Sequence, residues 1–113
     1  MMPLAGLPTV DADAAQSATD AVLLDVRERD EWSLGHAPAA VLVPMSELAR
    51  RIDELDVTRR IVCVCRSGNR SARVTAFLIQ QGYDAVNLAG GMYAWASAGH
   101  PVVTSAGGPG VVI

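Results

Sequence analysis

The sequence predicts an α/β protein in three layers, with a mostly parallel central sheet of five strands and helices on both faces. Two observations predict it. Short apolar runs alternate with helix-like segments along the chain. The runs at 22–26 and 61–64 are almost continuously apolar, which is typical of parallel strands buried on both faces. Half of the 113 residues are hydrophobic, enough for one core without disulfides or a structural metal.

The first half of the chain is expected to hold three strands, each followed by a helix. After a strand at 9–10, Asp11 can cap a helix over 12–18 because its side chain can accept a hydrogen bond from the first turn. The strand at 22–26 precedes a short helix over 28–34, which begins with acidic residues and stops at Gly35. A third strand over 41–43 ends at Pro44. Ser46 can then cap a helix whose apolar side carries Leu48, Ala49, Ile52 and Leu55.

The second half repeats the alternation. The strand at 61–64 leads through a polar loop into a helix that runs to Gln81, with Gly82 as its C-cap. A last strand at 85–88 precedes a helix over 91–98, which buries Met92 and Trp95. We expect one domain over 1–103 and a flexible C-terminal tail over 104–113, which is rich in glycine and serine.

Composition excludes several classes of function. The net charge is −3, all nine cations are arginines, and they form no basic stripe, so we expect no nucleic-acid partner. No apolar run approaches bilayer length, so we expect no membrane association and a cytoplasmic location. His36 and His100 lack ligand-like spacing to each other or to a cysteine, so we expect neither a metal nor another cofactor.

Cys65 is the candidate nucleophile. It ends a predicted buried strand and precedes a short polar loop and a helix, and such a loop can surround an anion with N–H groups and lower the pKa of a thiol. Gly68 allows the tight turn that this loop needs. Cys63 is too close in sequence for an unstrained disulfide with Cys65. We interpret it as a buried apolar residue, with a resolving thiol as the alternative.

Arg27 lies far from this loop in sequence but not in the predicted fold. The carboxyl ends of parallel strands share one edge of the sheet, so the residues after 22–26 should lie near Cys65. Arg27 could then bind a substrate at the Cys65 site. The alternative is a solvated residue at the start of a helix, paired with Glu31.

Four motifs in order carry a resemblance to a known family. They are Leu24-Asp25-Val26-Arg27 with Glu31; Gly35-His36 with Ala40 and Pro44; Cys65-Arg66-Ser67-Gly68-Asn69-Arg70-Ser71; and Leu88-Ala89-Gly90-Gly91-Met92 with Trp95. Over about residues 10–103 the chain resembles a single-domain rhodanese, a sulfurtransferase of the thiosulfate type. The segment 36–40 departs from the usual family pattern, in a loop away from the predicted chemistry.

The resemblance implies a transferase in which Cys65 carries sulfur as a persulfide. The donor would be thiosulfate or another sulfane-sulfur compound, and the acceptor would be cyanide, a small thiol or a thiol protein. Substrate contacts would come from the loop after Cys65. Its backbone would surround the sulfur, and its two arginines would attract an anionic donor; the residues concerned are Arg66, Ser67, Gly68, Asn69, Arg70 and Ser71.

Two alternatives differ in class. Cysteine-based phosphatases and arsenate reductases have a Cys-x5-Arg loop, whereas Cys65 and Arg70 form Cys-x4-Arg, a shorter loop suited to a single sulfur atom. The second alternative is a non-catalytic rhodanese-like module that only binds partners. Such modules typically lack the cysteine, which this chain keeps.

Overall fold

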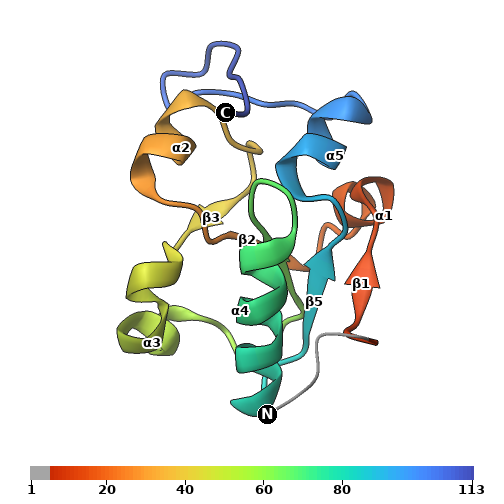
Figure 1. Cartoon of the computed structure of the whole chain (residues 1–113), viewed down its shortest axis with the longest axis vertical. Coiled ribbons are helices and arrows are strands. Elements are labelled where there is room, and N and C mark those ends of the chain that lie inside the picture. Colours follow the sequence, from red (N-terminus) through yellow and green to blue (C-terminus); the bar gives the residue numbers. More distant parts are fainter. Residues whose placement is uncertain (1–5) are drawn as a thin grey trace.

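The computed structural model describes residues 6–113 and contains the predicted five-stranded sheet (Figure 1). The strand order is β1-β5-β4-β2-β3, and every neighbouring pair is parallel. The strands are β1 (Thr9–Val10), β2 (Val22–Asp25), β3 (Val41–Leu42), β4 (Ile61–Val64) and β5 (Ala85–Leu88). The central position of β4 explains its continuously apolar sequence, because both of its faces and both of its edges are covered.

The helices follow the predicted order. They are α1 (Ala12–Ser17), α2 (Arg29–Leu34), α3 (Leu48–Arg51), α4 (Asn69–Gln80) and α5 (Gly91–Ser97), with 3₁₀ turns η1 (Met45–Glu47) and η2 (Ile52–Glu54) on either side of α3. Asp11 caps α1 as predicted, accepting from the Ala14 N–H at 2.8 Å. Within the described residues, no helix is long and apolar enough to cross a bilayer.

One predicted cap is wrong. Ser46 was expected to cap a helix, but Pro44 occupies the N-cap position of η1. The segment 45–54 is divided into two 3₁₀ turns and the short α-helix α3 between them. The Ser46 hydroxyl donates instead to the Glu28 carboxylate, at 3.0 and 3.2 Å. The serine therefore connects this segment to the start of α2.

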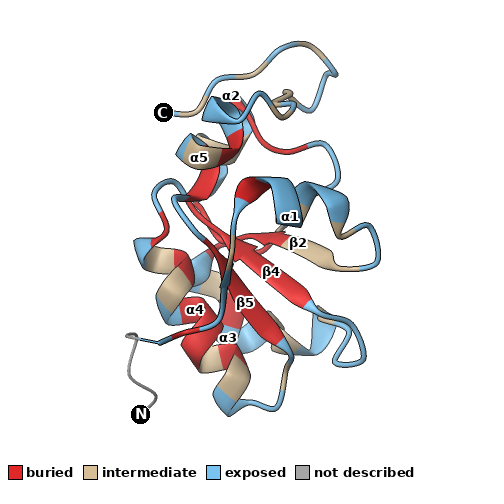
Figure 2. Cartoon of the chain, turned by 90° about the vertical axis from the view of Figure 1, so that its right-hand side faces the viewer, coloured by how far each residue is buried: buried red, intermediate tan, exposed pale blue. Residues whose placement is uncertain are grey.

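Two layers of helices enclose the sheet (Figure 2). Helices α3 and α4 pack on one face, and α1 and α5 pack on the other. Side chains of β4 alternate between them: Ile61 and Cys63 pack toward α4, whereas Val62 and Val64 pack toward α5. This is the predicted three-layer α/β architecture.

The C-terminal segment differs from the expected loose tail. Val103 forms antiparallel bridges with His36 and with Pro109. The Val111 N–H donates to the Leu34 carbonyl at 2.8 Å, and the segment crosses above the end of α2 (Figure 1). The physical reason is glycine, because a Cβ on Gly110 would lie 2.7 Å from the Gly35 Cα and 3.0 Å from the Leu34 carbonyl oxygen. Glycine content indicated flexibility, but here it permits close backbone packing.

A buried ion pair connects β2 to the chain that follows it. The Arg27 guanidinium donates to Asp25 at 2.8 to 3.1 Å, and both side chains are 0% exposed. The same guanidinium donates to the Gly35 carbonyl at 2.8 Å, which holds the end of α2 against the sheet.

Replacing Asp25 with asparagine should destabilise the fold strongly. The change leaves the Arg27 charge buried without a counter-ion, a situation that costs about 3–5 kcal/mol in proteins. Urea unfolding measures the loss. The control is Glu54→Gln, which breaks the ion pair with Arg51 on the surface; the Glu54 side chain is 55% exposed, so this change should cost far less. Equal losses in the two variants would contradict the argument.

Candidate active site around Cys65

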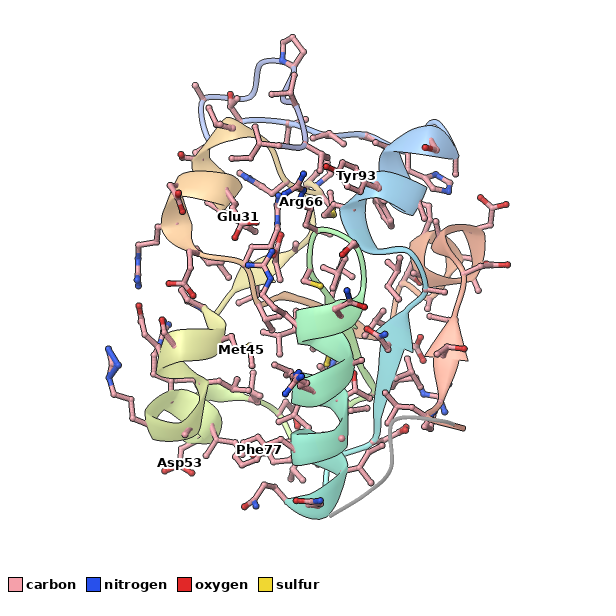
Figure 3. The ribbon with its side chains drawn as sticks, viewed as in Figure 1. Glu31, Met45, Asp53, Arg66, Phe77 and Tyr93 are labelled. Carbon is pink, nitrogen blue, oxygen red and sulfur yellow. The ribbon has the colours of Figure 1, made fainter. Side chains whose placement is uncertain are left out.

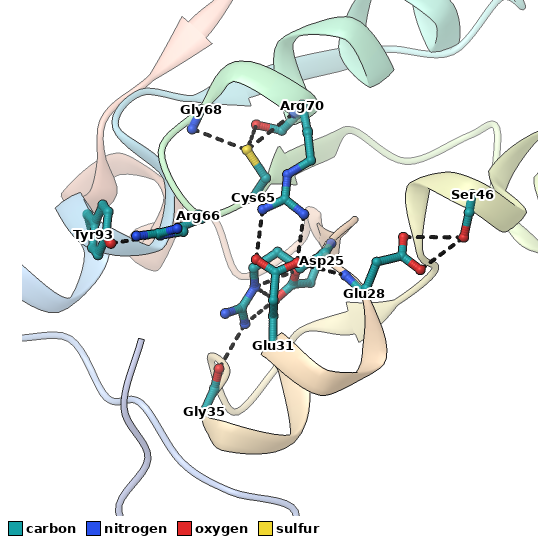
Figure 4. Close-up of polar contacts among 12 residues, drawn as sticks. Asp25, Glu28, Glu31, Gly35, Ser46, Cys65, Arg66, Gly68, Arg70 and Tyr93 are labelled. Atoms are coloured by element: carbon teal, nitrogen blue, oxygen red, sulfur yellow. Dashed lines mark hydrogen bonds and ion pairs between the residues drawn. The ribbon is translucent and has the colours of Figure 1, made fainter. Parts of the chain in front are cut away.

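The loop after β4 surrounds the sulfur of Cys65 with hydrogen-bond donors (Figure 4). The Gly68 N–H lies 3.1 Å from Sγ, and the N–H and hydroxyl of Ser71 each lie 3.3 Å from it. Gly68 has a φ of 106°, in the left-handed region where a side chain would be strained, and α4 begins at the next residue. The sulfur therefore lies at the N-terminus of a helix, inside a turn of backbone.

The neighbouring helix holds this loop in its orientation. The N–H groups of Met92 and Tyr93, in the first turn of α5, donate to the carbonyls of Cys65 and Arg66 at 2.8 and 3.1 Å. Because the carbonyl and the following N–H of a peptide point in opposite directions, drawing the Arg66 carbonyl toward α5 turns the Ser67 N–H toward the sulfur. Gly91 makes the approach possible, since a Cβ there would lie 2.5 Å from the Cys65 carbonyl oxygen.

The pKa values of the two cysteines are shifted in opposite directions. Burial raises the pKa of the Cys65 thiol, but hydrogen bonds from the Ser71 hydroxyl and from the N–H groups of Ser71, Gly68 and Ser67 outweigh it, so the pKa is below the ordinary value. Burial raises the pKa of Cys63 to about 12, so Cys63 is a protonated, unreactive thiol near neutral pH. This acidity argues against Cys63 as a resolving thiol.

Asn87 of β5 belongs to the site, and sequence reasoning missed it. The Ser71 hydroxyl lies 2.6 Å from Asn87 Oδ1, and Asn87 Nδ2 donates to the Gly68 carbonyl at 3.1 Å. The amide thus holds both residues that contact the sulfur. The Ser71 hydroxyl has a single hydrogen, which Asn87 accepts when Cys65 is a thiol and the thiolate can accept when it forms. The available signal was one polar residue in an otherwise apolar strand.

Each loop arginine is held by a different helix. Arg70 forms a two-bond ion pair with Glu31 of α2, at 2.6 and 2.8 Å. Arg66 donates from Nε to the Tyr93 hydroxyl at 2.7 Å, and its guanidinium lies 5.1 Å from the centre of the Tyr93 ring. Figure 3 shows Glu31 and Tyr93 reaching toward the loop from either side. The sequence predicted the arginines but neither partner in these roles.

The environment of Arg27 differs from both sequence-based interpretations, a substrate contact and a solvated partner of Glu31. Its side chain is 0% exposed and is bound to Asp25 and to the Gly35 carbonyl, so it is neither solvated nor paired with Glu31. In this arrangement of the chain, Arg27 has no exposed surface for a donor molecule to contact. The reason is its neighbour in β2, because the Asp25 carboxylate accepts both the Arg27 backbone N–H and its guanidinium. The interpretation of Arg27 as a solvated residue is therefore wrong, and its substrate contact stays a prediction that these contacts do not support.

The loop residues come together as predicted, although not all by their side chains. Residues 65–71 form one continuous turn around Sγ. Ser67 and Asn69 are exposed, which fits the expectation that they contribute mainly backbone. Over residues 6–113, the structure contains no group of three or more His, Cys, Asp or Glu side chains arranged to hold a metal ion.

Comparison with known proteins identifies the family. A family model described as the rhodanese-like domain matches residues 9–98. The chain belongs to the rhodanese family. A protein of Allochromatium vinosum named "Sulfurtransferase" is 43% identical over 89 residues, which are 78% of this chain and 83% of that protein.

Solved structures agree with this rhodanese assignment. A crystal structure of a rhodanese-related protein from Thermoplasma volcanium is 33% identical, with a TM-score of 0.80 over 85% of this chain and 97% of that one. The crystal structure of a thiosulfate sulfurtransferase from Pseudomonas aeruginosa is 27% identical, with a TM-score of 0.80 over 96% of this chain but 22% of that one. The rhodanese fold and the sulfurtransferase family are thus established for this chain.

Replacing Gly91 with alanine should disturb the site of this rhodanese. The new Cβ would push against the Cys65 and Arg66 carbonyls, and overpacking of this kind costs about 1–3 kcal/mol. We expect a lower unfolding free energy and slower alkylation of Cys65 by iodoacetamide. Gly82→Ala is the control, because Gly82 also has a positive φ, 91°, but has nothing within 4 Å of its Cβ position. Normal alkylation of Gly91→Ala would contradict the proposed packing role.

The pH dependence of Cys65 alkylation should report its environment. Because the pKa is lowered, the alkylation rate should rise with pH through a midpoint below the ordinary thiol value of about 8.5. Ser71→Ala removes one donor and should move the midpoint upward. Thr75→Val is the control, since the Thr75 hydroxyl donates to the Ser71 carbonyl at 2.8 Å and not to the sulfur. An unchanged midpoint in Ser71→Ala would show that the hydroxyl does not stabilise the thiolate.

Proposed function

We propose that the protein transfers sulfane sulfur from thiosulfate, or a related donor, to cyanide or a thiol through a persulfide on Cys65. The single observation that carries the proposal is the set of three donors within 3.1 to 3.3 Å of Cys65 Sγ. Donors in this arrangement stabilise a thiolate before attack and can stabilise the negative terminal sulfur of a persulfide afterwards.

The reaction divides into two displacements. In the first, the Cys65 thiolate attacks the outer sulfur of thiosulfate, a new S–S bond forms, and the S–S bond of thiosulfate breaks. Sulfite leaves with the electron pair, and the negative charge of the thiolate moves to the terminal sulfur of the persulfide. In the second, cyanide attacks that terminal sulfur, thiocyanate leaves, and the Cys65 thiolate is restored.

The loop encloses the Cys65 sulfur closely, which favours the transfer of a small group such as a single sulfur atom. Cys65 is 1% exposed, so an incoming atom must fit within the turn formed by 65–71. The lowered pKa increases the share of Cys65 present as thiolate, which makes attack less dependent on a general base.

The phosphatase alternative is less well supported by the geometry. The loop has the shorter Cys-x4-Arg spacing, and the Arg70 guanidinium is bound to Glu31, so it does not close a ring of donors around a tetrahedral oxyanion. A purely binding module would have no need of a thiol whose pKa is lowered by several hydrogen bonds. Both features favour sulfur transfer.

A thiocyanate assay tests the proposal. The wild-type protein with thiosulfate and cyanide should form thiocyanate, and after thiosulfate alone its intact mass should increase by one sulfur atom. Cys65→Ser should abolish both signals, whereas Cys63→Ser should retain the sulfur adduct because Cys63 is a buried, protonated thiol. A wild-type protein that gains no sulfur from thiosulfate or from any other sulfane-sulfur donor would refute the transferase proposal and favour a binding module.

A further inference from the structure

The two arginines of the loop differ in how much charge they offer to a donor. Both guanidinium–carboxylate bonds of Arg70 go to Glu31, and the Glu31 side chain is only 14% exposed. Arg66 is bound through Nε to an uncharged phenol and is exposed. Among residues 6–113, no carboxylate forms an ion pair with Arg66. The positive charge of Arg70 is therefore compensated by a carboxylate, whereas the positive charge of Arg66 is not.

This difference follows from the fold and not from the loop itself. Glu31 also accepts a hydrogen bond from the Glu28 N–H at 3.1 Å, as part of the capping box that begins α2. The carboxylate is thus held at the helix start while it binds Arg70. An anion that approached Arg70 would have to displace Glu31 or share the guanidinium with it, and it would meet the repulsion of a second negative charge.

We propose that Glu31 sets the charge of the preferred donor. By occupying Arg70, it leaves Arg66 as the loop arginine available to a donor, so the site favours sulfane-sulfur donors with one negative charge over the thiosulfate dianion. A thiosulfonate has this chemistry: its outer sulfur passes to the Cys65 thiolate, and a sulfinate leaves with the electron pair of the broken S–S bond. The inference rests on the proposed sulfur transfer and specifies its substrate class.

The experiment compares two donors that differ in charge. Thiosulfate is the dianion and methanethiosulfonate is the monoanion, and each can deliver one sulfur to Cys65. The kcat/KM for each is measured in the wild type, in Glu31→Gln and in Glu28→Gln. Glutamine at position 31 keeps an oxygen for the Glu28 N–H but releases Arg70 from its charged partner. Glu28→Gln is the matched control, because it removes the same charge from the same helix start without touching a loop arginine.

The wild type should prefer methanethiosulfonate. In Glu31→Gln, kcat/KM for thiosulfate should rise relative to that for methanethiosulfonate by roughly tenfold, the order that a hydrogen bond to a charged group contributes. The ratio in Glu28→Gln should stay within about twofold of the wild type, because a charge that is exposed and unpaired with the loop has little effect. An unchanged ratio in Glu31→Gln, or an equal change in Glu28→Gln, would overturn the inference.

A second pair of variants keeps the test decisive if Glu31→Gln does not fold. Arg66→Gln should raise KM for methanethiosulfonate by roughly tenfold, and Arg70→Gln should raise it much less. The reverse order would overturn the inference. These outcomes are separate from failure of the proposed function, in which neither donor would leave a sulfur atom on wild-type Cys65 by intact mass.

Discussion

The candidate site depends on the two hydrogen bonds by which α5 holds the carbonyls of Cys65 and Arg66. They fix the direction of the first two peptides of the loop, 65–66 and 66–67, and the second of these carries the Ser67 N–H, which helps to lower the Cys65 pKa. The bonds are short because Gly91 has no side chain, and they are in reach because β4 and β5 are parallel neighbours whose carboxyl ends lie together. Without this constraint, the same loop could present its oxygens to Sγ and repel the thiolate.

The groups around the sulfur are held in place by partners from three other elements. Asn87 of β5 holds Ser71 and Gly68, Glu31 of α2 holds Arg70, and Tyr93 of α5 orients Arg66. The buried Asp25–Arg27 pair attaches the end of α2, the helix that carries Glu31, to β2. The proposed nucleophile and its loop are continuous in sequence, but the electrostatic environment of the sulfur is assembled from several elements along one edge of the sheet.

Sequence reasoning predicted the five strands, the order of the helices and the residues of the cysteine loop, because these depend on short-range patterns. It was wrong where a side chain had two possible partners. Ser46 could cap its own helix or bind Glu28, and Arg27 could face solvent or pair with Asp25. In each case the outcome depends on which group lies nearer after folding. The glycine-rich segment after Val103 was expected to be a flexible tail, and the structure gives it defined backbone contacts, since glycine permits both flexibility and close packing.

The sequence by itself determined the candidate nucleophile, the length of the loop and the family, because apolar periodicity, the Cys-x4-Arg spacing and four ordered motifs are written along the chain. Only the tertiary structure decided how the two loop arginines differ. Arg66 and Arg70 have the same side chain within one short loop, so their sequence positions carry no difference in charge. The difference arises because α2 brings a carboxylate to one and α5 brings a phenol to the other. Contacts across such sequence separations are set by packing, which no local pattern records.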